Sequence, residues 1–145
     1  MVVATPQAQF GLPEAKVGLY AYGGGLPRLL RTAGLHIASE IALSGRSISA
    51  QEALQHNLIN RISETPDTLI DEAISIARQI AAVSPDAMIV TRSALREAWE
   101  TSSVERAFQN THERFYEKLM AGDNSSEGLA AFEEKRQPRW KVSKL

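Results

Sequence analysis

Glu14 is the side chain in this sequence best suited to acid–base chemistry. It follows Phe10-Gly11-Leu12-Pro13, a glycine turn and a rigid proline, and it precedes the apolar run Val17-Gly18-Leu19. A carboxylate on a short ordered turn beside apolar neighbours is partly desolvated, which suits it for proton transfer at neutral pH. The alternative is that Glu14 lies at a helix N-terminus and stabilises the helix dipole. The spacing alone leaves both interpretations open.

Three consecutive glycines, Gly23-Gly24-Gly25, precede a predicted helix. Such a loop brings backbone N–H groups close to a ligand, and a helix N-terminus favours an anion. No Lys-Ser or Lys-Thr follows, so the segment is not a P-loop, and no dinucleotide-binding glycine motif is present. The alternative is a tight connection that needs positive φ.

A third feature is an aromatic and a lysine three residues apart, Phe132 and Lys135, within the segment Phe132-Glu133-Glu134-Lys135-Arg136. On one helix face, such a pair is able to stack on a base and contact a phosphate. The alternative is a core phenylalanine beside a solvated charge cluster.

The final tripeptide, Ser143-Lys144-Leu145, matches the signal that directs proteins to the peroxisome. It follows a basic, proline-containing stretch, residues 135–141, which predicts an accessible and flexible tail. We therefore expect a peroxisomal location, with the import receptor as a partner.

The bulk composition narrows the function classes. A chain of 145 residues, 43% of them hydrophobic, buries one modest core and forms at most one domain. A net charge of -1 argues against a nucleic-acid partner, and no run of 18 apolar residues is present to span a membrane. The absence of cysteine excludes disulfide and thiolate chemistry, and the three scattered histidines give no reason to expect a metal site.

Only three short strands are expected, at residues 2–4, 8–10 and 58–62, and helical patterns fill about two-thirds of the chain. A capping box, Ser49-x-x-Glu52, predicts a helix start, as do two proline signals and two further polar caps. The helices expected from these patterns are 27–33, 35–43, one from Ser49 to His56, one from Thr65-Pro66 to Ala81, one from Ser84-Pro85 to Trp99, one from Ser102 to Leu119 and one from Asn124 to Phe132.

In this order along the chain, the features resemble the C-terminal half of the enoyl-CoA hydratase/isomerase (crotonase) family. The resemblance covers essentially the whole chain. The stretches that carry it are Ala8-Gln9-Phe10-Gly11-Leu12-Pro13-Glu14, Gly18 through Arg28, Leu43 through Ala53, Leu58-Ile59-Asn60-Arg61 and Glu127 through Arg136.

The resemblance implies an α/β fold that is mostly α in this chain. Residues 1–65 would form the C-terminal part of the ClpP/crotonase spiral, with few short strands, the glutamate and the glycine-rich loop. Residues 66–145 would form a helical subdomain that makes homotrimers or hexamers and ends in the signal 143–145. Glu14 would be the second of two catalytic glutamates, which exchanges a proton at the carbon next to the thioester carbonyl.

The resemblance also implies a binding surface for acyl-CoA. Phe132 and Lys135 would touch the adenine and phosphates of coenzyme A bound by a neighbouring subunit. The acyl pocket would be lined by the glycine-rich loop and its surroundings, namely Gly11, Pro13, Tyr22, Gly24 and Gly25. Coenzyme A is part of the substrate, so no separate cofactor and no metal are expected.

Two departures from the family pattern bear on the activity. The family loop Pro-Gly-Ala-Gly-Gly-Thr is replaced by Ala21-Tyr22-Gly23-Gly24-Gly25-Leu26, which leaves the acyl-pocket shape open. The oxyanion hole and the first catalytic glutamate of the family lie upstream of the residues present here. Because hydration needs both an oxyanion site and a second carboxylate, we expect a truncated chain with little or no activity alone.

The expected activity of the complete protein is a lyase reaction of peroxisomal acyl-CoA metabolism, the hydration of 2-enoyl-CoA to 3-hydroxyacyl-CoA. An enoyl-CoA delta isomerase is one alternative, since a glutamate at position 14 is able to move a double bond. The other is a non-catalytic module that binds coenzyme A or joins subunits through its helices.

Overall fold

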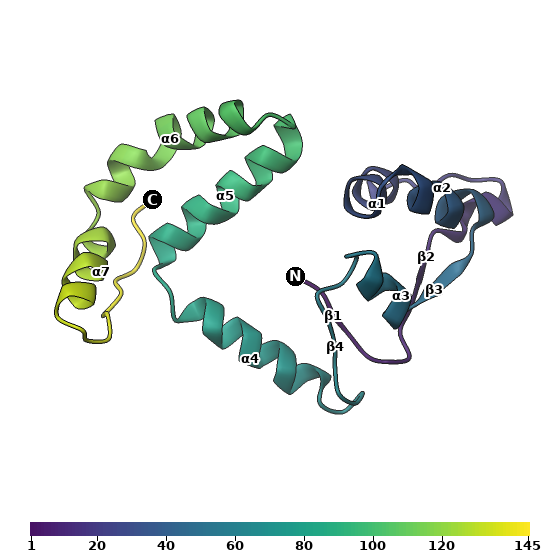
Figure 1. Cartoon of the computed structure of the whole chain (residues 1–145), viewed down its shortest axis with the longest axis horizontal. Helices are drawn as coiled ribbons and strands as arrows, with labels where there is room; N and C mark the ends of the chain where they lie inside the picture. Colours follow the sequence, from purple (N-terminus) through teal and green to yellow (C-terminus); the bar gives the residue numbers. More distant parts are fainter. The chain divides into compact units, whose positions relative to one another are not determined.

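The computed structural model describes residues 1–145 and divides into two units, Met1–Ile76 and Ala77–Leu145 (Figure 1). The division falls inside helix α4 (Leu69–Ala81), whereas the sequence analysis places the change at residues 65/66. As expected, helices dominate and the strands are few and short.

The strands form two separate two-stranded ladders in the first unit. Strand β1 (Val3–Ala4) pairs in parallel with β4 (Arg61–Ile62), and β2 (Gln9–Gly11) pairs antiparallel with β3 (Ser47–Ser49). In the second ladder Phe10 lies opposite Ile48. Strand β3 was missed in the sequence because three residues, Ser-Ile-Ser, give too little alternation to be recognised.

The core of the first unit brings the strands and helices together around two fully buried isoleucines. Ile41 belongs to helix α2 (Leu35–Ser44) and Ile48 to β3, and each has only 1% of its surface exposed. Helix α3 (Ala50–Gln55) contributes Ala50 and Ala53, whose small side chains let its backbone approach the cluster closely.

Helix α3 begins where the sequence predicts. The Ser49 hydroxyl accepts a hydrogen bond from the backbone N–H of Glu52, 3.2 Å away, so the N-cap is confirmed. The reciprocal half of the capping box is not formed, because the Glu52 carboxylate binds the Arg46 guanidinium instead. Two further helical elements lie between β2 and α2, the 3-10 helix η1 (Pro13–Val17) and helix α1 (Gly25–Ala33).

The second unit is an assembly of helices. Helix α5 (Pro85–Thr101) is followed by α6 (Val104–Met120) and α7 (Asp123–Glu133). Ser84 caps α5 as predicted, accepting from the N–H of Ala87. The break between α5 and α6 is set by Ser102, whose φ of 55° ends α5 in the left-handed region.

Four predicted helix starts are wrong by one to three residues, the first being α1, which begins at Gly25 and not at Pro27. Helix α6 is capped by Ser103 rather than Ser102, because Ser102 is the terminator of the preceding helix. Residues Thr65 and Thr68 bond each other's backbone and side chains in a turn, which delays α4 to Leu69. Asn124 lies inside α7 and is 2% exposed, so it is a buried hydrogen-bonding residue and not a cap.

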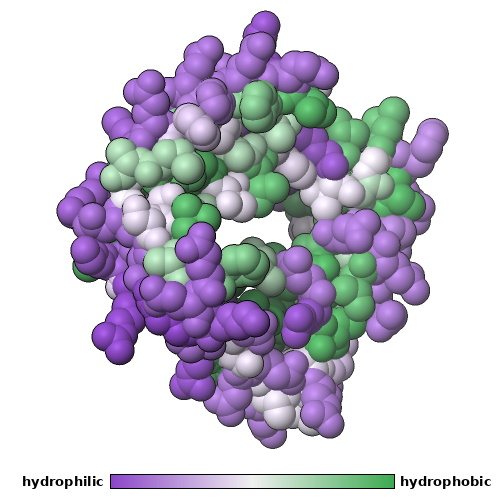
Figure 2. All heavy atoms as spheres, turned by 60° about the vertical axis from the view of Figure 1, so that its left-hand side comes forward, coloured by the Kyte–Doolittle hydropathy of each residue, from purple (hydrophilic) through white to green (hydrophobic).

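No single helix is both long enough and apolar enough to cross a membrane, although α4 and α5 taken as one bent pair meet the two criteria together. Many large apolar side chains reach the surface, and green atoms are prominent in the view of Figure 2.

Candidate active site

Glu14 lies in the first turn of η1, with Pro13 at a starting position where its missing N–H costs nothing. The residue is half-buried, and its Oε2 atom is buried without a hydrogen-bond partner. A buried carboxylate oxygen without a donor is destabilising for the fold, by about 1–3 kcal/mol or more for a charged group. An oxygen kept in this state is available to take or give a proton, as acid–base chemistry requires.

The turn that carries Glu14 is fixed at both ends. At its start, a Cβ on Gly11 would lie 3.0 Å from the backbone oxygen of Arg46, so a side chain there would push β2 slightly away from β3. At its end, Gly18 adopts a φ of 76°, and the N–H of Leu19 donates to the Glu14 carbonyl at 3.0 Å. The side chain is therefore held on an ordered turn, as the sequence predicts.

The glycine-rich loop lies against this turn. Gly23 and Gly24 have φ values of 64° and 83°, which only glycine adopts without strain. Gly25 opens α1, and a Cβ added to it would lie 3.1 Å from the Leu12 side chain, directly before the Pro13-Glu14 pair. The structure thus brings the predicted site residues Gly11, Pro13, Glu14, Gly24 and Gly25 into neighbouring segments of one unit.

Two tyrosines precede the glycines. Tyr22, a predicted pocket residue, is exposed, and its ring centroid lies 4.1 Å from that of Tyr20. Arg28, which was not predicted as a site residue, donates from Nη1 to the carbonyls of Gly23 and Gly24. An arginine one turn into a helix that follows consecutive glycines is the signal that could have found it.

The other carboxylates of this region serve the fold. Arg46 donates from Nε to Glu40 and from both Nη atoms to Glu52. The hydrogen bond from Arg46 holds the pKa of the Glu52 carboxyl below its ordinary value. These groups are already paired, so we assign them no acid–base role. No three His, Cys, Asp or Glu side chains converge as metal ligands do.

The predicted coenzyme A contacts belong to the second unit. Phe132 is 85% exposed on α7, which excludes the core alternative for this side chain. Lys135 lies beyond the end of α7 in the left-handed region, with a φ of 52°, rather than on the same helix face. Glu14 and this pair belong to different units, so their roles toward one ligand stay predictions.

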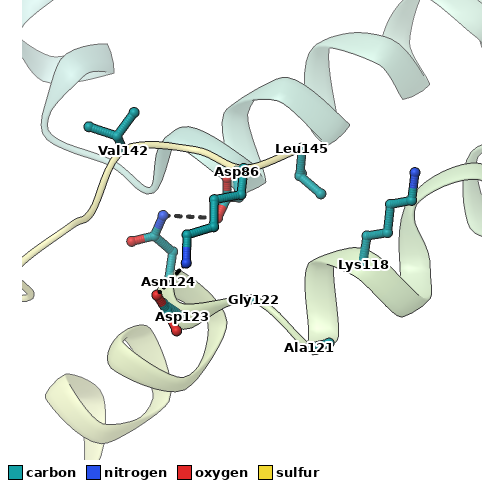
Figure 3. A pocket seen from close by; sticks show the side chains of 9 residues that line it. Asp86, Lys118, Ala121, Gly122, Asp123, Asn124, Val142 and Leu145 are labelled. Carbon is teal, nitrogen blue, oxygen red and sulfur yellow. Dashed lines mark hydrogen bonds and ion pairs between the residues drawn. The ribbon is translucent and has the colours of Figure 1, made fainter.

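The carboxyl-terminal tail is not free. Leu145 and Val142 line a cavity of about 220 Å³ together with Asp86, Lys118 and Asn124 (Figure 3). The Lys144 ammonium lies 3.2 Å from Asp123, and the N–H of Leu145 donates to the Ser143 hydroxyl. The tripeptide 143–145 therefore makes contacts with the second unit but stays largely exposed, with 83% of the Lys144 side chain and 37% of Leu145 open to solvent.

Comparison with known proteins decides the family. A family model described as enoyl-CoA hydratase/isomerase matches residues 1–143. The chain belongs to the enoyl-CoA hydratase/isomerase family. The enoyl-CoA hydratase subunit I of Geobacillus kaustophilus superposes with a TM-score of 0.91 at 31% identity, over 99% of this chain and 55% of that one. The crotonase fold is thereby confirmed for this member of the family.

Two curated relatives of this chain are named as hydratases. The mevalonyl-coenzyme A hydratase sidH of Aspergillus fumigatus is 48% identical over 145 residues, which is 100% of this chain and 53% of the relative. The 2,3-dehydroadipyl-CoA hydratase of Escherichia coli is 36% identical over 97% of this chain and 54% of the relative. The chain spans about half the length of the curated relatives it matches.

The peroxisomal location predicted from Ser143-Lys144-Leu145 is wrong. The relatives of this enoyl-CoA hydratase/isomerase family member are a fungal mevalonyl-coenzyme A hydratase and bacterial hydratases, and bacteria have no peroxisomes. The correction rests on these relatives, since the ion pair of Lys144 with Asp123 is exposed and leaves the terminus accessible. The tripeptide is better described as part of the second unit.

Proposed function

We propose that this chain contributes one of the two catalytic glutamates, Glu14, to the active site of an enoyl-CoA hydratase. In this reaction water adds across the double bond of a 2-enoyl-CoA to give a 3-hydroxyacyl-CoA, and Glu14 exchanges the proton at the carbon next to the thioester carbonyl. The observation that carries the proposal is the Oε2 atom of Glu14, which is buried without a partner on a turn packed against a glycine-rich loop. The hydratases among the relatives support the choice of reaction.

The substrate class follows from the same relatives. The mevalonyl-coenzyme A hydratase sidH covers the whole of this chain at 48% identity, which supports a short, branched acyl-CoA that carries a hydroxyl group. Tyr22, which stands where the family loop has a glycine, and the adjacent Tyr20 are compatible with a polar acyl chain. The exposed Phe132 and Lys135 would contact the adenine and phosphates of coenzyme A in a neighbouring subunit of a trimer or hexamer.

A complete site needs more than Glu14. An oxyanion site for the thioester oxygen, often worth several kcal/mol, and a second carboxylate to activate water would come from the part of the relatives that these residues do not match. We therefore expect the purified 145-residue chain to show little or no turnover with crotonyl-CoA. Turnover that Glu14→Gln abolishes would overturn this expectation of inactivity.

The sharper test places residues 1–145 in the matching segment of the Aspergillus fumigatus hydratase and measures hydration of 2-enoyl-CoA substrates. We expect activity that falls by about 10²–10⁴-fold in Glu14→Gln, the usual range for a lost general acid or base. Glu64→Gln, an exposed glutamate of the same unit, is the matched control and should leave the rate unchanged. Undiminished hydration by Glu14→Gln would refute the proposal, and faster turnover of a 3-enoyl-CoA would identify an isomerase instead.

A further inference from the structure

The side chain of Arg28 forms hydrogen bonds with the backbone of the glycine-rich turn. Its Nη1 atom lies 3.0 Å from the Gly24 carbonyl oxygen and 3.3 Å from that of Gly23, and donates to both. The Gly24 oxygen also accepts from the backbone N–H of Arg28 at 3.4 Å. The charged guanidinium makes these bonds stronger than neutral ones, so they stabilise a turn that contains two left-handed glycines.

The position of the Arg28 guanidinium requires that residue 24 has no side chain. A Cβ added to Gly24 would lie 2.2 Å from Nη1 of Arg28, so the arginine occupies the space that any side chain at position 24 would need. Nothing lies within 4 Å of a Cβ added to Gly23, so the close approach is specific to Gly24.

The fixed turn leads directly to the segment that carries Glu14. Gly25 follows the two glycines whose carbonyls accept from Arg28, and a Cβ added to it would lie 3.1 Å from Cδ2 of Leu12. Leu12 is the N-cap of η1, two residues before Glu14, and packs against the core cluster. A shift of the glycine turn would therefore press on Leu12 and move the start of η1.

From this arrangement we infer that Arg28 is a positioning residue, which sets the place of Glu14 through the glycine turn and Leu12. The inference rests on the proposed function, because it gives Arg28 importance for the reaction only if Glu14 transfers the proton. A displacement of a reacting group by about 1 Å costs on the order of a hundredfold in rate. A partial loss of order in the turn should lower the rate with little change in substrate affinity.

The first test uses the 145-residue chain and needs no turnover. Amide hydrogen exchange followed by NMR is compared for the native chain, Arg28→Ala and Arg28→Lys. In Arg28→Ala the N–H groups of Gly25 and Leu19, which bond Tyr22 and Glu14, should exchange at least about fivefold faster. The N–H of Leu58, bonded to Ala53 in the same unit, should change by less than about twofold. Arg28→Lys keeps a donor for the Gly24 carbonyl and should restore most of the protection.

The second test places the same substitutions in the grafted hydratase described above. Arg28→Ala should lower kcat by about tenfold with KM within about twofold, and Arg28→Lys should recover most of the loss. Equal acceleration of exchange at all three amides, or an unchanged kcat, would overturn the inference. If Glu14→Gln keeps full activity, the proposed function fails, and the exchange result still shows whether Arg28 orders the turn of Glu14.

Discussion

The Nδ2 atom of Asn124 donates to the Oδ2 atom of Asp86 at 2.8 Å, between two helix starts that are 38 residues apart (Figure 3). Both residues are buried. Asn124 also donates to the Lys141 carbonyl and accepts from the Lys141 N–H, so one side chain joins α5, α7 and the tail. The second Asp86 oxygen, Oδ1, is buried without a partner, so Asn124 is the only hydrogen-bond partner of this carboxylate.

Asn124→Ala should detach the tail and destabilise the second unit. Three hydrogen bonds disappear and the buried Asp86 carboxylate loses its remaining donor, which should lower the free energy of unfolding by about 2–4 kcal/mol. The release of Leu145 by a carboxypeptidase should become at least several times faster. Asn110→Ala, which removes an exposed bond to Glu97, is the matched control. Equal release rates from the two variants would contradict this account of the tail.

Comparison of Gly24→Ala with Gly23→Ala should separate two contributions to stability in the glycine-rich turn, the backbone strain and the loss of the Arg28 hydrogen bonds. Both positions have positive φ, so each alanine should destabilise the fold by about 1–2 kcal/mol through backbone strain. Gly24→Ala should cost about 1 kcal/mol more, because the new methyl group displaces the Arg28 guanidinium from two carbonyls. Chemical denaturation of both variants measures the difference. In an Arg28→Ala background the extra cost should vanish, and its persistence would mean that Arg28 does not fill the space.

Glu14→Gln should leave the stability unchanged or raise it by up to about 1 kcal/mol, in contrast to its effect on activity. The carboxylate carries a buried oxygen with no donor, and a neutral amide removes the charge from this position. A thermal unfolding curve at pH 7, compared with that of Glu64→Gln, measures the effect. A marked loss of stability in Glu14→Gln alone would indicate that the carboxylate holds the turn together.

Glu127 and Arg136 should make the second unit sensitive to acid. Two hydrogen bonds from Arg136, with a further one from the Arg139 N–H, lower the pKa of the Glu127 carboxyl from 4.5 to about 2. The stabilisation is therefore complete above pH 4.5 and disappears as the pH falls through about 2. Glu127→Gln should unfold at a lower temperature than the native chain at pH 7, and the two melting temperatures should converge near pH 2. A constant difference at both pH values would contradict the assignment.

The sequence predicts the fold best where a local chemical signal exists. Ser49 and Ser84 bond the N–H groups that start their helices, because a cap depends on residues three positions away and on little else. The strand at Ser47–Ser49 escapes prediction because it is defined by its pairing with β2, which is a tertiary contact. The same holds for Asn124, which a local pattern marks as a cap and the fold uses as a buried bridge.

The residues of the candidate site also differ in how far the sequence predicts them. Glu14 and the glycines are visible in the sequence since a rigid turn and positive φ values need particular residue types. Arg28 is less visible, because only its position one turn into a helix after consecutive glycines marks it, and its bonds to the two carbonyls form in the folded chain. The tail predicted to be exposed from the composition of residues 135–141 is mostly exposed, but the hydrogen bonds that tie it to Asn124 have no local signal.

The attachment of the tail to Asn124 also bears on how the protein is best handled in the laboratory. An affinity tag joined to this end would compete with the two hydrogen bonds that hold Lys141 to Asn124. Met1 is 75% exposed, so a tag at the opposite end extends into solvent from the outset. A comparison of the two tagged versions is therefore itself a measure of how firmly the final residues are anchored.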